Sequence, residues 1–377
     1  MKIDTVSRIA EFETLRNEWD AVVSTARYPH LCFTHDWLVV WWQAFDRQER
    51  RVAVYLGREG DKVVAAVPVQ RRATAVAGIP VRSLELTANL HTFRLDFVVP
   101  GDRDPGPYVE SLLDGVLAGR EMPDVLFFKD LPSDSPTVAA LERLAARRRL
   151  GIGRENERRS PYVCTDGPWE DYFRGLSKNL RSSLRRSRKR CQEAGVSFER
   201  VVDEPRGASR LEEGLALEAE GWKGRGGPAI LASPEETSFY RGLLRRFEGS
   251  GRLAQYALRL GQRLIAWDLC VTEAGASHDL KTAYAEEQAQ LAPGFALQME
   301  MMKHAFRAPE VCIYDMLPPP AAYKLRWTPD ALDQVSLRLY CRTPRGRLTH
   351  LLQGRLRPLL RRSTLLRRVK RRVLGPR

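Results

Sequence analysis

The stretch Arg252–Val271 reads RLAQYALRLGQRLIAWDLCV and predicts a β-hairpin, because two apolar runs rich in β-favouring residues flank a tight turn at Gly261. A second predicted hairpin, RVAVYLGREGDKVVAAVPV at Arg51–Val69, precedes it by 201 residues. The positions that coincide without a gap include Arg51/Arg252, Ala53/Ala254, Tyr55/Tyr256, Gly60/Gly261 and Ala65/Ala266. The match favours an internal duplication.

The order of elements after each hairpin supports the same interpretation. A helix candidate follows in both halves, at Tyr108–Ala118 and at Pro293–Phe306. An apolar strand that ends in an acid and a proline comes next, VLFFKDLP in the first half and VCIYDMLP in the second. We therefore expect two similar α+β domains with a boundary near residues 156–161.

The composition is that of a globular protein with two cores. The chain has 377 residues, of which 43% are hydrophobic and 29% charged. The six cysteines are scattered without a CxxC pair, which fits a reducing compartment. The first residues lack the apolar core of a signal peptide, and no uncharged run reaches the length of a membrane span. These features predict a cytoplasmic protein.

The net charge of +14 is concentrated in two segments. Lys178–Arg190 reads KNLRSSLRRSRKR, which could grip RNA phosphates but is better interpreted as an amphipathic helix with Leu180 and Leu184 inward. The second segment, residues 344–377, has twelve Arg or Lys residues and no acid. Its leucines follow helical spacing, which predicts peripheral contact with an anionic membrane; a helix packed on the protein is the alternative.

The stretch QLAPGFAL at Gln290–Leu297 predicts a loop that opens a helix at a Pro-Gly pair. Free N–H groups and the positive end of the helix dipole make such a helix start suitable for an anion, above all phosphate. Pro-Gly helix starts are also common without a ligand, so the surrounding sequence has to decide between the two interpretations.

Four segments of the second half resemble one acyltransferase family. They are WEDYFRGLSKNLRSSLRRSRKRCQEAG (169–195), LEAEGWKGRGGPAI (217–230), LKTAYAEEQAQLAPGFAL (280–297) and YDMLPPPAAYKLRWT (314–328). The chain thus resembles the CelD-like (BcsL-like) branch of the GNAT superfamily, which is related to the Fem-type peptidyl transferases. FTHDWLVVWW and NLHTFRLDF extend the resemblance into the first half. One departure is that Gln290 and Gly294 are separated by three residues, where the superfamily loop has two.

The resemblance implies an α+β fold of two tandem GNAT-like domains, each a mixed central sheet flanked by helices, followed by a basic helical tail. The domains expected are a degenerate N-terminal domain at residues 1–155, the acyltransferase domain at 156–343 and the tail at 344–377. The implied activity is transfer of an acyl group, with acetyl the expected one, from acyl-CoA to an amine or hydroxyl by direct attack.

The resemblance also implies a donor site. The predicted strand Asp279–Ala285 would bind the donor arm, and the turn formed by Pro293, Gly294, Phe295, Ala296 and Leu297 would bind its pyrophosphate. Fem-type relatives use aminoacyl-tRNA as donor, which stays open as an alternative. A non-catalytic protein that binds membrane or nucleic acid through its basic segments is the other alternative.

Four residues are candidates for catalysis. Glu218 lies on the apolar stripe of its predicted helix, where burial would raise its pKa toward that of a general base; a paired structural carboxylate is an equal alternative. Asp315 ends an apolar strand and could instead cap a turn. Lys324 matches the position where Fem-type enzymes place a lysine near the acyl group. Tyr323 could protonate the leaving thiol or simply pack on Trp327.

Trp222, Lys223, Lys281 and Tyr284 are the candidates for substrate contact, with plain solvent exposure the alternative for the last two. No metal is expected, because the six histidines form no HExxH or comparable pattern. A Walker loop, a Rossmann glycine pattern and a G-x-S-x-G elbow are absent from the sequence. The expected acceptor is a small molecule, a glycan or a lipid; nucleic acid is not expected as a partner.

Overall fold

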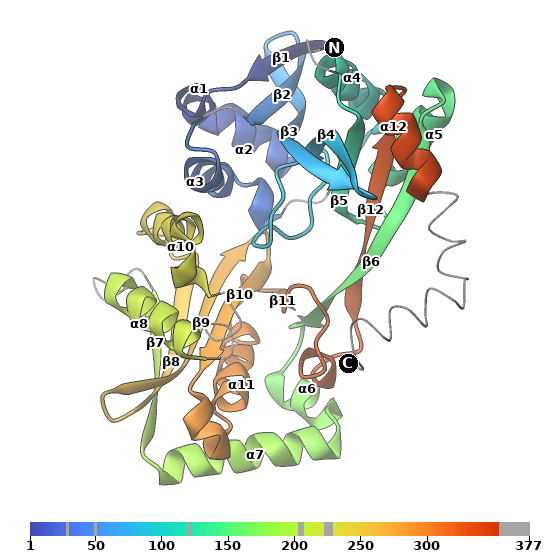
Figure 1. Cartoon of the computed structure of the whole chain (residues 1–377). Helices are drawn as coiled ribbons and strands as arrows, with labels where there is room; N and C mark the ends of the chain where they lie inside the picture. Colours follow the sequence, from blue (N-terminus) through green and yellow to red (C-terminus); the bar gives the residue numbers. More distant parts are fainter. Residues whose placement is uncertain (28–29, 49–50, 119–121, 203–206, 222–228, 354–377) are drawn as a thin grey trace, which may run out of the picture. The chain divides into compact units, whose positions relative to one another are not determined.

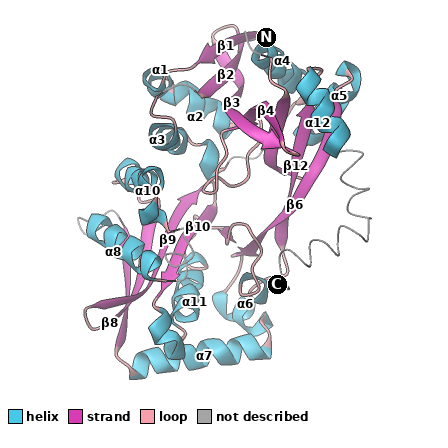
Figure 2. Ribbon diagram, in the orientation of Figure 1, coloured by secondary structure: helices cyan, strands magenta, loops and turns pink. Residues whose placement is uncertain are grey.

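The computed structural model describes the chain except residues 28–29, 49–50, 119–121, 203–206, 222–228 and 354–377 (Figure 1). The chain forms two compact units. Unit 1 contains residues 1–28, 49–157 and 334–377, and unit 2 contains residues 29–48 and 158–333. Both are mixed sheets with helices against them (Figure 2).

The sheet of unit 1 has the strand order β1-β2-β3-β4-β5-β12. Its strands are β1 (Lys2–Val6), β2 (Val52–Glu59), β3 (Lys62–Val76), β4 (Ile79–Leu86), β5 (Val125–Pro132) and β12 (Ala331–Tyr340). Its helices are α1 (Ile9–Thr14), α2 (Arg16–Ser24), α4 (Gly106–Leu117), α5 (Pro136–Arg148) and α12 (Pro344–Leu351). Only β4 and β5 pair in parallel among these neighbours.

The sheet of unit 2 has the order β7-β8-β9-β10-β11-β6. Its strands are β7 (Val196–Val202), β8 (Leu253–Leu260), β9 (Arg263–Glu273), β10 (Ala276–Tyr284), β11 (Ile313–Asp315) and the second part of β6 (Gly151–Cys164). The helices are η1 (Leu31–Phe33), α3 (His35–Phe45), α6 (Trp169–Gly175), α7 (Lys178–Glu193), α8 (Gly207–Glu220), η2 (Ile230–Ala232), α10 (Pro234–Phe247), η3 (Glu286–Leu291), α11 (Pro293–Ala305) and η4 (Lys324–Arg326).

The two sheets repeat the same pattern strand by strand. In each unit the first four strands pair antiparallel, the fourth and fifth pair in parallel, and the sixth is antiparallel to the fifth. The predicted hairpins are β2–β3 and β8–β9, and a register shift falls at equivalent steps, Gly57/Arg58 and Leu258/Arg259. Both turn glycines have φ +59°, a conformation that favours glycine. The repeat detected in the sequence is therefore a repeat of fold.

Helices cover both faces of the sheet in unit 2. Gly214 of α8 lies against the Trp267 ring, where a Cβ would approach to 2.2 Å, so α8 covers the Trp267 face. Tyr256 pairs with Asp268, the next residue along β9, and points to the opposite face. There its ring contacts His304 of α11, with 6.0 Å between centroids. The faces are named below as the α8 face and the α11 face.

The segment 29–48 belongs to unit 2, although the sequence assigned residues 1–155 to one domain. Helix α3 packs on α10: Trp37 meets Phe239 edge to face at 5.1 Å, and Val40 lies where a Cβ on Gly242 would come within 2.8 Å. The end of the predicted second domain differs as well, since residues 334–343, which include most of β12, belong to unit 1. Hydrophobic periodicity located these elements but carried no information about the sheet on which each one packs.

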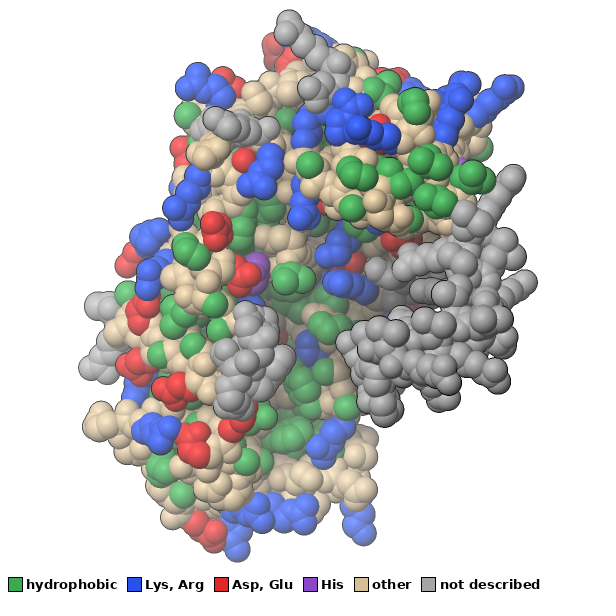
Figure 3. Space-filling view, viewed as in Figure 1, with side chains coloured by type: hydrophobic (Ala, Val, Ile, Leu, Met, Phe, Trp, Pro, Cys, Tyr) green, Lys and Arg blue, Asp and Glu red, His purple; other side chains and the backbone are tan. Residues whose placement is uncertain are grey.

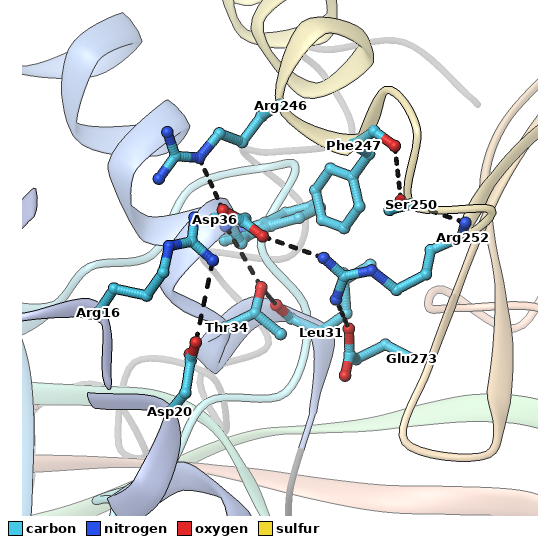
Figure 4. A network of polar contacts seen from close by, with 11 residues as sticks. Arg16, Asp20, Leu31, Thr34, Asp36, Arg246, Phe247, Ser250, Arg252 and Glu273 are labelled. Carbon is cyan, nitrogen blue, oxygen red and sulfur yellow. Dashed lines mark hydrogen bonds and ion pairs between the residues drawn. The ribbon is translucent and has the colours of Figure 1, made fainter. Parts of the chain in front are cut away.

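A buried carboxylate anchors α3 (Figure 4). Asp36 is 6% exposed and accepts from Arg246 Nε at 2.6 Å and from Arg252 Nη2 at 3.0 Å. Arg252 also pairs with Glu273 and stacks on the Phe247 ring at 4.6 Å. The network joins α3, α10, β8 and β9. The buried Asp36 carboxylate needs these guanidinium partners because it has lost its hydration by water.

Other sequence expectations are met with small differences. The periodic segment from Ile9 to Val22 is two helices, since Leu15 adopts φ −89° and ψ 10° between them. Leu180 and Leu184 of α7 are fully buried, as predicted for the basic helix. Most of the basic tail lies outside the described residues. Among the described residues, no helix is long and apolar enough to cross a bilayer.

We predict that Asp36→Ala lowers the free energy of unfolding by about 2–3 kcal/mol, because two arginines lose a charged acceptor. Urea denaturation followed by circular dichroism measures the change. The control is Asp20→Ala, whose carboxylate is 49% exposed and 3.9 Å from Arg16; it should cost less than about 0.5 kcal/mol. Equal losses for the two variants would show that the Asp36 network does not hold α3.

Candidate active site

The sheet of unit 2 opens between β10 and β11. The two strands pair in parallel only over Ala276–His278 and Ile313–Asp315. Strand β11 ends at Asp315 while β10 continues to Tyr284. On this side no described strand pairs with Asp279–Tyr284, so their backbone groups are available to an extended ligand, as an exposed sheet edge is to an added strand.

The start of α11 follows directly after β10 and η3. Ala292 takes a left-handed conformation, φ 50° and ψ 53°, and the helix begins at Pro293 as the sequence predicted. The amides of Phe295 and Ala296 donate to Ala292 O, whereas the Gly294 amide donates to no described residue. A Cβ on Gly294 would lie 3.5 Å from the Tyr284 ring, so a methyl group fits there in van der Waals contact and a larger side chain would meet Tyr284.

Helix α7 fixes the loop before α11. Ser187 Oγ lies 2.8 Å from Leu291 O and 3.0 Å from Ala292 O, and Arg190 Nη1 donates to Gln290 O at 2.8 Å. The guanidinium of Arg326 stacks on the Phe295 ring at 4.8 Å. Figure 3 shows basic side chains along α7 at the lower edge of the molecule. The first turn of α11 is thus held rigidly and surrounded by cations, which suits a phosphate.

A β-bulge directs side chains to both faces at the opening. Asp279 pairs with Cys270 and Lys281 with Leu269, so Leu280 is an extra residue in β10. Consecutive residues of β9 point to opposite faces, and their partners Asp279 and Lys281 therefore do so too. Without the bulge both side chains would share one face.

Glu218 and Lys281 lie on the α8 face. Glu218 is 2% exposed, and its Oε2 accepts from the Ile230 amide at 3.0 Å. Lys281 Nζ lies 5.4 Å from the centre of the Tyr240 ring. Burial raises the pKa of Tyr240 well above its usual value, and the Glu218 carboxylate adds to the shift. The predicted base and the predicted substrate contact therefore both lie near Tyr240.

The α11 face has a pair of buried carboxyl groups that sequence reasoning missed. Asp268 and Asp279 are 4% and 8% exposed and are joined by a side-chain hydrogen bond. Burial raises the pKa of Asp268 well above its usual value, and the neighbouring Asp279 carboxylate raises it further. Protonation is thus favoured at Asp268, which is the donor in the hydrogen bond to Asp279. Tyr314 Oη donates to Asp279 Oδ2 at 3.4 Å.

Lys324 and Tyr323 lie beside this pair. Burial raises the pKa of Asp279, and the Lys324 ammonium partly offsets that effect. Lys324 Nζ donates to Met316 O at 2.6 Å and to Leu317 O at 2.7 Å, so it ties down the chain that follows β11. The phenol of Tyr323 is close enough for both carboxyl groups to raise its pKa, after burial as the main cause.

Asp315 is fully buried at the end of β11. It accepts from Ser160 Oγ and from the Leu317 amide, both at 3.0 Å, and lies 3.3 Å from His278 Nδ1. His30 completes a cluster whose possible ligand atoms lie within 4.8 Å. The Cys32 amide donates to His30 Nδ1, which places the proton of a neutral ring on Nε2. His30 in this tautomer has no lone pair for a metal.

The structure thus groups most of the predicted residues at one opening in the sheet. Asp315, Tyr323 and Lys324 gather around the end of β11, and Glu218 and Lys281 both lie near Tyr240 on the α8 face. Trp222 and Lys223 lie outside the described residues. The missed residues are Asp268, Asp279, Tyr240 and Arg326. An acid inside the apolar run LIAWDLCV is the signal that could have identified Asp268.

Residues 178–325 match the acetyltransferase (GNAT) domain family. This range contains the opening, the start of α11 and both clusters of side chains. The fold is GNAT-like. No curated protein sequence matches the chain.

Solved structures share this fold at low sequence identity. FemX aligns with a TM-score of 0.61 and 14% identity, covering 93% of this chain and all of that one. A conserved protein of unknown function from Bacteroides thetaiotaomicron aligns at 0.58 and 11%, covering 90% of this chain and all of the other. L-PGS from Bacillus licheniformis aligns at 0.53 and 12%, covering 90% and 96%.

The proton on Asp268 gives a pH prediction. The pKa of this carboxyl group is higher in the folded protein than in the unfolded chain, where it is about 4. Its contribution to stability is therefore complete below pH 4 and is lost as the pH rises through the pKa of the folded state. Asn at 268 cannot ionise, and its amide still donates to Asp279. We predict that the stability of Asp268→Asn relative to the wild type rises as the pH increases above 4.

Urea denaturation at pH 5 and pH 8 measures this effect. The control is Asp330→Asn, an exposed position in the same unit, for which the difference from the wild type should stay constant. A constant difference for Asp268→Asn as well would show that Asp268 is ionised in the folded protein.

Proposed function

We propose that this protein is an acyltransferase that moves an acyl group from acyl-CoA to an amine or hydroxyl acceptor by direct attack. One observation carries the proposal: β10 loses its partner strand immediately before a rigid helix start whose Gly294 amide is unused. A pantetheine arm is an extended chain of amides that can pair with Asp279–Tyr284. Its pyrophosphate then meets the first turn of α11, with Arg190 and Arg326 nearby.

The side chains on the two faces act on the two sides of the thioester. The acceptor attacks the thioester carbonyl from the α8 face, a bond forms from its nitrogen or oxygen to carbon, and Glu218 takes the proton. The C–S bond breaks on the other side, where the Tyr323 hydroxyl, kept protonated by its raised pKa, donates a hydrogen bond to the leaving thiolate and solvent supplies the proton. Lys324 positions this side through its bonds to Met316 O and Leu317 O. Such positioning supplies much of the rate in direct transfer.

A second donor, aminoacyl-tRNA, is favoured by one specific observation. The helix that holds the donor loop, α7, has six exposed cations: Lys178, Arg185, Arg186, Arg188, Lys189 and Arg190. Sixteen residues extend over about 24 Å, which exceeds what one pyrophosphate needs. Titration with acetyl-CoA and with charged tRNA, each over a range of salt concentrations, separates the two donors, since RNA binding would show the steeper salt dependence.

The donor site is tested by Gly294→Trp. A large side chain at the start of α11 fills the space where the backbone has to approach phosphate, so the affinity for acetyl-CoA measured by calorimetry should fall at least tenfold. Gly175→Trp is the control, because a Cβ there meets nothing within 4 Å and the site is distant in sequence from the loop. Undiminished binding by Gly294→Trp would place the donor elsewhere.

The base is tested by Glu218→Gln, which keeps an oxygen to accept from the Ile230 amide. We predict an unchanged melting temperature and a loss of turnover of about two orders of magnitude, measured as free thiol released from acetyl-CoA with an acceptor panel. Glu220→Gln, on the same helix and exposed, should retain activity. Normal turnover combined with lowered stability in Glu218→Gln would assign Glu218 a structural function only.

A further inference from the structure

A pocket of about 270 Å³ in unit 1 lies where β12 ends and α12 begins. It is lined by Arg149, Gly151, Tyr340, Cys341, Arg342, Arg347 and His350. No acidic residue is among these lining residues. None of them belongs to the acyl-transfer site in unit 2, so the pocket needs an explanation of its own.

The three arginines of the pocket are all exposed, and none has a side-chain ion pair or hydrogen bond with another residue in the part of the chain that the structure describes. Two other arginines of unit 1 have acidic partners: Arg58 binds Asp4, and Arg338 binds Glu155 at 2.9 Å. Three guanidinium groups around one small space repel one another, and this repulsion is relieved when an anion enters.

Arg149 has a left-handed backbone conformation, and the residue lines the pocket. Arg149 caps α5 in the left-handed conformation, φ 53° and ψ 42°, and its amide donates to carbonyls in the last turn. Glycine is the residue that this conformation favours. The cap position therefore has a charged side chain that lines the pocket where glycine would leave none.

The remaining walls are closely packed. The His350 ring stacks on Tyr340 with 4.9 Å between centroids, and a Cβ on Gly151 would come within 2.5 Å of that ring. Tyr340 Oη donates to Gln353 Oε1 at 2.7 Å. Burial raises the pKa of the Cys341 thiol to about 12, so it is no nucleophile near neutral pH. The pocket therefore has groups for binding but none for covalent chemistry.

We propose that this arginine pocket binds a phosphate monoester. Guanidinium groups bind phosphate oxygens in pairs, and a phosphate monoester near neutral pH has close to two negative charges to set against three cations. A single carboxylate would leave more of the charge uncompensated. The volume of about 270 Å³ lies just below the usual range of about 300–1,000 Å³ for ligand pockets, which fits a phosphate on a small group. The phosphate can belong to a soluble ester or to a lipid headgroup.

Calorimetry with glycerol 3-phosphate and with inorganic phosphate, at a constant ionic strength set by chloride, tests the site. The wild type should bind glycerol 3-phosphate, and Arg347→Ala should lose at least tenfold in affinity. Arg345→Ala is the matched control, since it removes the same charge from α12 outside the pocket; its affinity should stay within about twofold of the wild type. Absence of binding by the wild type, or equal losses in both variants, would overturn the proposal.

Arg149→Gly separates binding from folding. Glycine relieves the left-handed backbone, so the melting temperature without ligand should rise while the affinity for glycerol 3-phosphate falls at least tenfold. A variant that is more stable and binds as the wild type does would remove Arg149 from the site.

Vesicles distinguish the two sources of the phosphate. Phosphatidic acid presents a monoester and phosphatidylglycerol a diester, so a lipid ligand should give tighter binding to phosphatidic acid, lost in Arg347→Ala and kept in Arg345→Ala. Binding of glycerol 3-phosphate without this preference assigns the pocket to a soluble ester. Failure of both probes would refute the arginine pocket without touching acyl transfer, which uses unit 2.

Discussion

The early end of the parallel pair β10–β11 is the constraint from which the candidate site follows. Parallel neighbours need a crossover connection, and here α11 makes it. The crossover brings a helix start beside the strand edge that has just lost its partner. A ligand with an extended arm can pair with the free edge of β10 while its phosphate end lies at the start of α11. The bulge at Leu280 directs the side chains of Asp279 and Lys281 to opposite faces of the sheet beside this ligand.

The repeat shows why unit 2 rather than unit 1 is the candidate catalytic unit. Strands β4 and β5 of unit 1 also pair in parallel over three residues, but β4 ends at Leu86, one residue after that pairing, and leaves no long free edge. In addition, at the offset of 201 residues Val67 stands where unit 2 has Asp268. Val67 is fully buried and adds only to the core. In unit 2 the buried carboxyl groups of Asp268 and Asp279 lower the free energy of unfolding, because burial of ionisable groups is costly. A function at the opening between β10 and β11 would explain why they are present in spite of that loss of stability.

Sequence analysis predicted the fold well because its main signals are local. The hairpin turns need glycine at φ +59°, and Pro293 can only begin a helix, so Gly60, Gly261 and Pro293 were readable directly. The contents of the site depend on tertiary pairing instead. Asp268 and Asp279 meet because an extra residue shifts the register of β10, which no periodicity reveals. The hydrogen bonds of Lys324 likewise depend on the path of the chain after β11.

Hydrogen–deuterium exchange with and without acetyl-CoA tests most directly whether a donor occupies the opening between β10 and β11. An arm paired with the free edge of β10 and a phosphate on α11 should slow exchange in Leu280–Tyr284 and Gly294–Leu297. Helix α8 and the strands of unit 1 should change little. Protection confined to unit 1, or none at acetyl-CoA concentrations that saturate binding, would contradict the account.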